Sequence, residues 1–140
     1  MNTVDDVKMV EFRDFGDERG KLVVIEGSRD IPFEIERVFY IYDSDHDIIR
    51  GQHANRQSEF VLINVSGRSK VKVYDGKNSK IFSLDKPMTG VYLPSMIWKD
   101  MYDFSEDSVL LVLASAHYDE SEYIREKEVY EKLMHAQNGD

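Results

Sequence analysis

The segment from Arg50 to Glu59 carries the side chains best suited to chemistry in this sequence, namely a histidine, three amides, two arginines and a carboxylate. In an extended strand, residues i and i+2 point to the same side, so His53 and Asn55 share one face, expected to be the interior. Histidine titrates near neutral pH, whereas an amide does not. On that face His53 is therefore the one group that can transfer protons near neutral pH.

The same segment, closed by Gly67, resembles the first motif of cupin barrels, in which His-x-His-x(3 or 4)-Glu on an inner strand normally builds a metal site. Asn55 stands where that motif has its second histidine. The second cupin motif falls on Trp98–Asp100, where metal-binding relatives carry another histidine. The sequence also lacks cysteine, so no thiolate site is possible. We therefore expect neither a metal centre nor another cofactor.

Length and composition indicate one globular domain spanning residues 1–140. A chain of 140 residues with 41% hydrophobic residues can bury a substantial core. The formal charge of -9 disfavours nucleic acid as a partner, because a phosphate-binding face needs a basic stripe. A local cluster of arginines would still hold one small anionic ligand. We expect a cytoplasmic protein that does not enter a membrane, because no segment resembles a signal peptide or a membrane span.

Short strands separated by turn signals dominate the predicted secondary structure. The spacing is typical of an all-β sandwich or barrel. Only residues 120–136, rich in Glu, Lys, Tyr and Leu, favour a helix. Besides the motif segment, which we place on an inner strand, the expected strands are Lys8–Asp14, Lys21–Glu26, Glu36–Asp43, Gln57–Ser66, Lys70–Asp75, Ser79–Leu84, Thr89–Leu93, Ile97–Asp103 and Ser108–Ala114.

The order of motifs along nearly the whole chain resembles the cupin-fold sugar-nucleotide 3,4-ketoisomerases, which act on dTDP-4-keto-6-deoxyglucose. The matching pieces are Gly20-x-Leu22-x-x-Ile25-Glu26, Ile31-Pro32-Phe33-x-Ile35-x-Arg37-Val38-x-Tyr40-Ile41, Arg50-Gly51-x-His53-Ala54, Gly90-x-Tyr92, Trp98-x-x-Met101-x-Asp103-Phe104, Val109–Ser115 and Tyr118-Asp119-Glu120-x-x-Tyr123-Ile124-Arg125. The resemblance implies an RmlC-like jelly-roll cupin barrel and a homodimer that exchanges N-terminal strands. It also implies a dTDP-linked keto-sugar as the ligand, and no metal.

Moving a ketone from C4 to C3 of a sugar requires a base that removes the C3 proton, an enediol, and a proton returned to C4. His53 is the candidate base. Members of the family usually place a second histidine, a proton relay, at the position of Asn55. Three options stay open: His53 performs both transfers, another group such as water, Tyr40 or Tyr102 protonates C4, or the activity differs from that of the family. Asn55 itself is a candidate for a substrate hydrogen bond or for a structural amide.

The candidate substrate-binding residues are cations, aromatic side chains and one carboxylate. An arginine inside a barrel needs an anion, which a diphosphate would supply. The resemblance places Arg19 and Lys99 beside the hexose, where we expect them to influence the configuration at C4. We expect Glu59 on the His53 face, four residues beyond Asn55. The full candidate set is Arg19, Arg37, Arg50, Arg56, Glu59, Tyr92, Trp98, Lys99 and Tyr102, with His53, Asn55 and Tyr40 as the catalytic candidates.

Two alternatives to a ketoisomerase are a cupin epimerase similar to the 3,5-epimerases of rhamnose synthesis and a non-catalytic cupin that binds a nucleotide sugar. Deuterium exchange into C3 and C4 of the sugar would favour the ketoisomerase, and exchange into C3 and C5 the epimerase. Tight binding without exchange would favour the binding protein, which the replacement of a relay histidine by Asn55 makes more credible.

Overall fold

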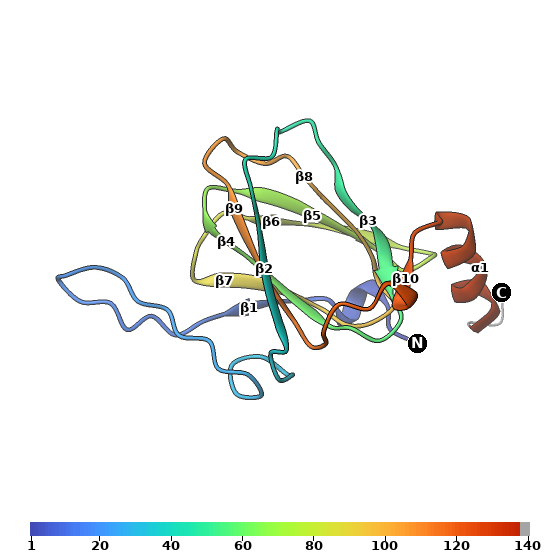
Figure 1. Cartoon of the computed structure of the whole chain (residues 1–140), viewed down its shortest axis with the longest axis horizontal. Helices are drawn as coiled ribbons and strands as arrows, with labels where there is room; N and C mark the ends of the chain where they lie inside the picture. The colour runs from blue at the N-terminus through green and yellow to red at the C-terminus, as the bar shows by residue number, and fades with distance from the viewer. Residues whose placement is uncertain (138–140) are drawn as a thin grey trace.

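Two five-stranded antiparallel sheets pack face to face in the computed structural model, which describes residues 1–137 (Figure 1). The first sheet has the order β1 (Lys8–Glu11), β7 (Thr89–Leu93), β4 (Phe60–Ser66), β9 (Val109–Ala114) and β2 (Arg37–Tyr42). The second has the order β10 (Tyr123–Ile124), β3 (Arg50–Asn55), β8 (Trp98–Tyr102), β5 (Ser69–Tyr74) and β6 (Ser79–Leu84). Two 3-10 helices (Val4–Asp6 and Glu120–Glu122) and the helix α1 (Lys127–Gln137) complete the described chain.

The main core lies between the two sheets. Leu62 of β4 pairs with Val112 of β9, and both pack in one cluster with Val71 of the opposite sheet. The neighbouring pair, Val61 and Leu113, points outward and is covered by a second cluster that includes Phe33 of the N-terminal segment. Because β4 and β9 are buried on both faces, they are apolar almost throughout and do not alternate.

The N-terminal segment departs from the predicted strands. The strand expected over Lys8–Asp14 ends at Glu11, and Lys21–Glu26 forms only a single bridge, between Asp14 and Val23. This part of the chain is a loose hairpin in which the Phe15 amide donates to the Leu22 carbonyl, and it reaches away from the barrel (Figure 1). An isolated two-stranded hairpin is marginal in water, which explains why no regular ladder forms.

The C-terminal region is only partly the helix expected over residues 120–136. Residues Glu120–Glu122 form a 3-10 helix, Tyr123–Ile124 pair with the end of β3, and α1 begins only at Lys127. Tyr130 and Met134 of α1 are fully buried against Trp98 of β8 and its neighbours. Pairing with the open edge of β3 therefore outweighs local helix propensity before Lys127. Within residues 1–137 no helix is long and apolar enough to cross a membrane.

Candidate active site

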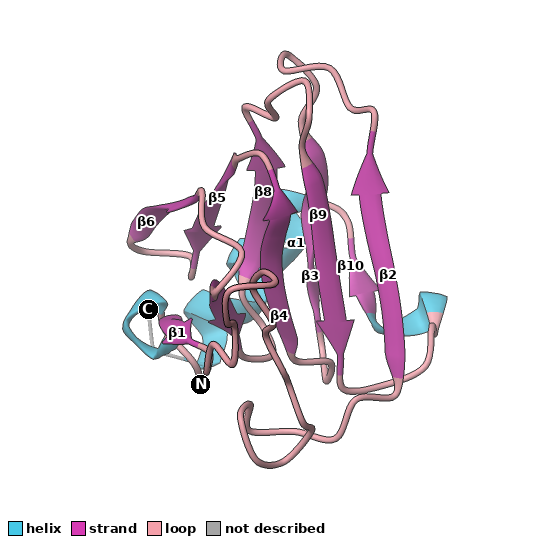
Figure 2. Cartoon of the chain, turned by 90° about the vertical axis from the view of Figure 1, so that its left-hand side faces the viewer, coloured by secondary structure: helices cyan, strands magenta, loops and turns pink. Residues whose placement is uncertain are grey.

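A cavity of about 590 Å³ opens between the sheets, where β2 at the edge of one faces β3 and β10 at the edge of the other (Figure 2). This volume lies in the range of small-molecule sites. Apolar side chains such as Phe39, Ile41, Phe60, Leu62, Met101 and Val112 form its floor and walls. The polar side chains that line it are Arg37, Tyr40, Arg50, His53, Lys99, Tyr118, Tyr123 and Arg125.

His53 is held in one orientation at the cavity wall. Its Nδ1 lies 3.0 Å from the carbonyl oxygen of Gly51, and its ring lies 4.8 Å from that of Tyr123. A carbonyl can only accept, so Nδ1 carries the hydrogen and Nε2 is left as the acceptor. Burial, reinforced by the positive charge of Lys99, lowers the pKa of His53 to about 4, although the Gly51 carbonyl opposes the shift. The imidazole is therefore neutral at pH 7 and ready to take a proton.

The Asn55 side chain is buried beside the cavity and links two charged groups. Its Oδ1 accepts from Lys99 Nζ at 3.1 Å, and its Nδ2 donates to Glu122 Oε1 at 3.0 Å. Asn55 does not line the cavity, so of its two proposed roles the geometry supports the structural amide. No three His, Asp or Glu side chains within residues 1–137 gather in a group that could hold a metal ion.

Glu122 is the anchor of this buried network. Its carboxylate accepts from Asn55, from the backbone amides of Gln57 (3.1 Å) and Ser58 (3.0 Å), and from the Ser58 hydroxyl. Burial alone would raise the pKa of Glu122, but these donors outweigh it and the net shift is downward. Glu122 thus ties the C-terminal segment to the loop after β3, and its negative charge acts on Lys99.

Lys99 is a buried cation on the cavity wall. Only 4% of its surface is exposed, and Nζ lies 4.0 Å from the centroid of the Phe60 ring. Burial lowers the pKa of Lys99 to about 7, with Glu122 opposing the shift and Arg37 adding to it. In the register of β3 and β8, Lys99 pairs directly with His53. The two side chains therefore stand next to each other on one face.

Comparison with known proteins shows the family of the chain. Residues 5–135 match the family described as FdtA, WxcM-like, C-terminal. The chain belongs to the FdtA family. A relative from Aneurinibacillus thermoaerophilus, a TDP-4-oxo-6-deoxy-alpha-D-glucose-3,4-oxoisomerase, is 42% identical over 127 residues, which are 91% of each protein.

Solved structures agree with the family. A histidine-to-asparagine mutant of the 3,4-ketoisomerase QdtA from Thermoanaerobacterium thermosaccharolyticum, in complex with TDP-4-keto-6-deoxyglucose, superposes with a TM-score of 0.92 and 40% identity. The match covers 94% of this chain and 96% of that one. WlaRA, a TDP-fucose-3,4-ketoisomerase from Campylobacter jejuni, gives 0.88 and 40%, covering 92% and 96%. These matches confirm the cupin-like jelly roll and favour a ketoisomerase over an epimerase or a non-catalytic binding protein.

Three arginines of this FdtA-family chain border the cavity. Arg37 stacks over Phe39 and Tyr118, at 5.2 and 5.5 Å from their ring centroids, while Arg50 and Arg125 lie on other parts of the lining. The Nε of Arg37 is buried, and no group within residues 1–137 accepts a hydrogen bond from it. Arg125 and Tyr123 were not among the candidate site residues, because the sequence predicted a helix for their segment. The family motif nevertheless contains both.

Several predicted site residues lie away from the cavity. Because side chains alternate along β8, Lys99 and Met101 face inward, and Trp98 and Tyr102 face outward. Trp98 packs on Tyr130 of α1, with ring centroids 5.6 Å apart. The structure thus corrects the placement of Trp98 and Tyr102. The sequence predicts that side chains alternate along this strand, but it does not show which of them face the cavity.

Glu59, Tyr92, Arg56 and Tyr40 also differ from expectation. Glu59 accepts a hydrogen bond from Tyr92, which packs with the outer cluster, so the expectation that Glu59 shares the His53 face is wrong. The chain turns between β3 and β4, which ends the alternation. Arg56 borders a separate surface hollow beside Leu133. Tyr40 reaches only the rim of the cavity and is 62% exposed.

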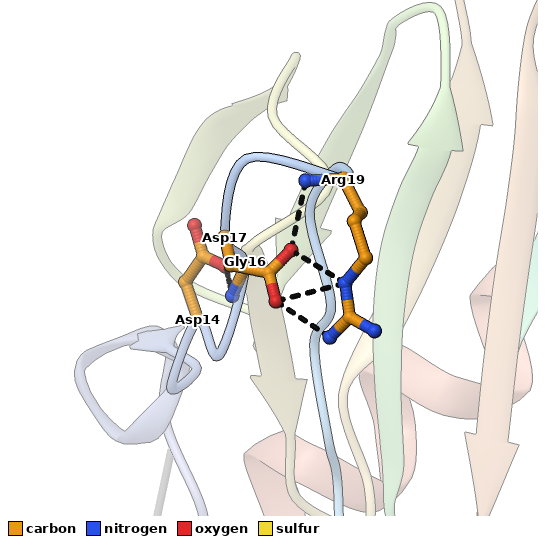
Figure 3. A network of polar contacts seen from close by, with 4 residues as sticks. All are labelled: Asp14, Gly16, Asp17 and Arg19. Carbon is orange, nitrogen blue, oxygen red and sulfur yellow. Dashed lines mark hydrogen bonds and ion pairs between the residues drawn. The ribbon is translucent and has the colours of Figure 1, made fainter.

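Arg19 does not line the cavity. It lies in the N-terminal hairpin beside Asp17 (Figure 3). Its guanidinium is held by the Asp17 carboxylate, with Nη2 at 2.6 Å from Oδ2, and the same carboxylate accepts from the Arg19 amide. The side chain is 86% exposed. Within a single chain, then, the structure does not bring Arg19 to the hexose position that the family resemblance implies.

The pH dependence of catalysis should report the unusual His53. A base acts only when neutral, so activity is lost as pH falls through its pKa. With the pKa of His53 lowered to about 4, kcat/KM should stay level from about pH 6 to about pH 5 and fall on the acid side only below that. A pH profile of initial rates tests this expectation. An acid limb near the ordinary histidine value of about 6.5 would contradict the role given to burial and to Lys99.

Replacing Gly51 should destabilise the fold, because the backbone at this position suits only glycine. Its φ is 85°, at a register shift in the pairing of β3 with β8, and an added Cβ would lie 2.9 Å from the Lys99 carbonyl oxygen. Gly51→Ala should lower the free energy of unfolding by about 1–3 kcal/mol, because both the positive φ and the contact are strained. Urea denaturation measures this, and a change below about 0.5 kcal/mol would contradict it.

Proposed function

We propose that this chain converts a TDP-linked 4-keto-6-deoxyhexose, TDP-4-keto-6-deoxyglucose in the first instance, into its 3-keto isomer. The observation that carries the proposal is His53, a neutral imidazole with a free Nε2 on a cavity bordered by arginines, in a chain of the FdtA family. The names of the relatives support the same reaction and substrate. A nucleotide-linked sugar as substrate favours the cytoplasm as the place of action.

The cavity matches the charges of such a ligand. Arg37, Arg50 and Arg125 offer guanidinium groups to a diphosphate, and the Nε of Arg37 is a donor that finds no acceptor in the described part of the chain, residues 1–137. Tyr118 and Tyr123, whose rings lie 5.5 Å apart, offer aromatic surface to a nucleobase or sugar. The sugar then lies deeper, between His53 and the apolar wall.

Tautomerisation of the keto-sugar requires a base and groups that stabilise the negative charge on the sugar oxygen. His53 Nε2 takes the C3 proton, and the negative charge that develops at O4 is stabilised by nearby cations in a site of low dielectric constant. The arginines that border the cavity are such cations, and the buried Lys99 stands beside His53 in the strand register. The apolar wall keeps bulk water from the enediol.

Product analysis tests the reaction. The chain is incubated with TDP-4-keto-6-deoxyglucose, and carbon NMR follows the ketone. Movement of the ketone from C4 to C3 is the expected result. Inversion at C5 with the ketone still at C4 would support the epimerase instead, and binding of TDP without any change in the sugar would support a binding protein.

We also propose that two copies of the chain form a dimer through their N-terminal hairpins. Phe15 and Leu22 are each about half exposed in the single chain, on the hairpin that reaches away from the barrel (Figure 1), and Met9 is 45% exposed on the adjoining strand β1. Exposed apolar groups gathered on one segment favour a partner surface. Exchange of the hairpins would carry Arg19 toward the partner subunit, which reconciles its expected place near a hexose with its position outside its own cavity.

Light scattering coupled to size-exclusion chromatography tests the dimer. The wild-type chain is expected at twice its mass of 16.3 kDa, and the double variant Phe15→Glu, Leu22→Glu at the monomer mass. A wild-type monomer at tens of micromolar would contradict the proposal. A double variant that remains dimeric would place the interface elsewhere.

A further inference from the structure

Asn55 cannot donate and recover a proton, and its side chain lies outside the cavity. Resting on the function proposed above, we propose that Lys99 is a second catalytic residue, which donates the proton that C4 receives while His53 removes the proton from C3. In this chain a buried lysine on β8 would thus do the work of a second histidine on β3.

The strand register places the two groups around the same space. His53 and Lys99 are direct partners across β3 and β8, so their Cβ atoms are about 5 Å apart on the inner face. Both side chains line the cavity, together with Phe60, over whose ring the Lys99 Nζ lies. A sugar ring bound there would contact the imidazole and the ammonium from neighbouring positions, as adjacent carbons C3 and C4 require.

Lys99 is anchored yet still able to donate. Among residues 1–137, Asn55 Oδ1 is the acceptor for Nζ, which leaves further N–H groups of the ammonium for a ligand. The charged groups around it are Glu122, behind Asn55, and Arg37 on β2, and the neutral His53 lies beside it. Burial lowers the pKa of Lys99 to about 7, close to working pH, where a general acid is most effective.

The tyrosines that could have served instead are poorly placed. Tyr102 points to the outer face of β8, because Lys99 and Met101 occupy the inner positions. Tyr40 lies at the rim and is 62% exposed. Among the groups considered for C4, Lys99 is the one that combines a dissociable proton, burial and a place on the inner face beside His53.

The proton balance is complete with these two residues. His53 Nε2 takes the C3 proton, the C3–H electrons form the C3–C4 double bond, and O4 becomes an oxyanion that takes the proton of the O3 hydroxyl. The electrons on O3 then form the C3 carbonyl, the double-bond pair moves to C4, and C4 takes a proton from the Lys99 ammonium. The turnover leaves an imidazolium and an amine, and a proton passed between them through water restores the starting state.

A partial reaction separates the two roles. In deuterated buffer, Lys99→Met should form the 3-keto product about 10²- to 10⁴-fold more slowly than wild type. It should nevertheless exchange the C3 hydrogen of the 4-keto sugar for deuterium at a rate within about tenfold of wild type, because His53 still opens the enediol. His53→Asn should lose both exchange and isomerisation. Proton NMR of the recovered sugar reads both.

Two further variants keep the test decisive. Lys99→Arg retains the charge but loses the dissociable proton, so it should be as slow as Lys99→Met, even if the methionine variant folds poorly. Lys72→Met, on the outer face of neighbouring β5, is the matched control and should leave both rates unchanged. The basic limb of kcat/KM should lie near pH 7 in wild type, where Lys99 loses its proton, and disappear in Lys99→Arg.

The outcomes distinguish this inference from the function on which it rests. A wild-type chain that leaves the substrate unchanged contradicts the proposed function. A wild type that isomerises, with Lys99→Met or Lys99→Arg within about fivefold of its rate, overturns the role of Lys99. Loss of C3 exchange in a folded Lys99→Arg that still binds TDP overturns it as well, because Lys99 would then be acting before the C4 step.

Discussion

His53→Asn is expected to lower kcat for ketone migration about 10³-fold while changing the affinity for TDP by less than about threefold. The imidazole Nε2 is the free acceptor on the cavity wall, and an amide in its place cannot take a proton. The arginines that border the cavity come from β2, the start of β3 and the C-terminal segment, so they remain in place. Initial rates and calorimetric titration with TDP measure the two quantities.

The matched control is His46→Asn, in the exposed loop between β2 and β3. It should keep the wild-type rate, because that side chain does not line the cavity. If His53→Asn retains more than about a tenth of the wild-type kcat, the base lies elsewhere and the assignment of the site fails.

Glu122→Gln is expected to lower the free energy of unfolding by about 2–3 kcal/mol at pH 7. The carboxylate accepts hydrogen bonds from Asn55, from the Ser58 hydroxyl and from two backbone amides, and it carries the charge that offsets Lys99. A glutamine has one acceptor oxygen, and its NH₂ group would face a donor. Urea denaturation of both proteins gives the difference.

The downward shift of the Glu122 pKa fixes how the loss of stability caused by Glu122→Gln depends on pH. A carboxyl whose pKa is lower folded than unfolded stabilises the fold above the unfolded value and loses that contribution as pH falls through the folded one. The difference between wild type and Glu122→Gln should therefore shrink below about pH 4.5. Glu120→Gln, which removes an exposed partner of Arg125, is the control and should cost less than about 1 kcal/mol. Equal effects of the two substitutions would contradict the anchoring role of Glu122.

Local patterns in the sequence were sufficient for the barrel and for its key histidine. Short strand-like runs separated by turn residues mark the strands from β2 to β9, and the resemblance to the first cupin motif places His53 on an inner strand. These features can be recognised from residues that are adjacent in the sequence, because each strand is short and each turn has its own characteristic residues. The absence of a second histidine, with Asn55 in its place, was equally visible.

The features that the sequence did not predict depend on pairing between strands that lie far apart in the chain. Glu122, Tyr123 and Arg125 lie in a segment of high helix propensity, yet the open edge of β3 draws Tyr123 and Ile124 into a short strand. The facing of Trp98 and Tyr102 depends on the register of β8, where a shift of one residue exchanges the inner and outer faces. The burial of Lys99 follows from that register too, so its low pKa was not foreseeable from residue type.

Position-specific deuterium incorporation tests the central claim most directly. The wild-type chain is incubated with TDP-4-keto-6-deoxyglucose in deuterated buffer, and proton NMR locates the label. We expect deuterium at C4 of a 3-keto product and, through the reverse reaction, at C3 of the remaining substrate, with none at C5. Label at C5, or recovery of unlabelled 4-keto sugar from a protein that binds TDP, would contradict it.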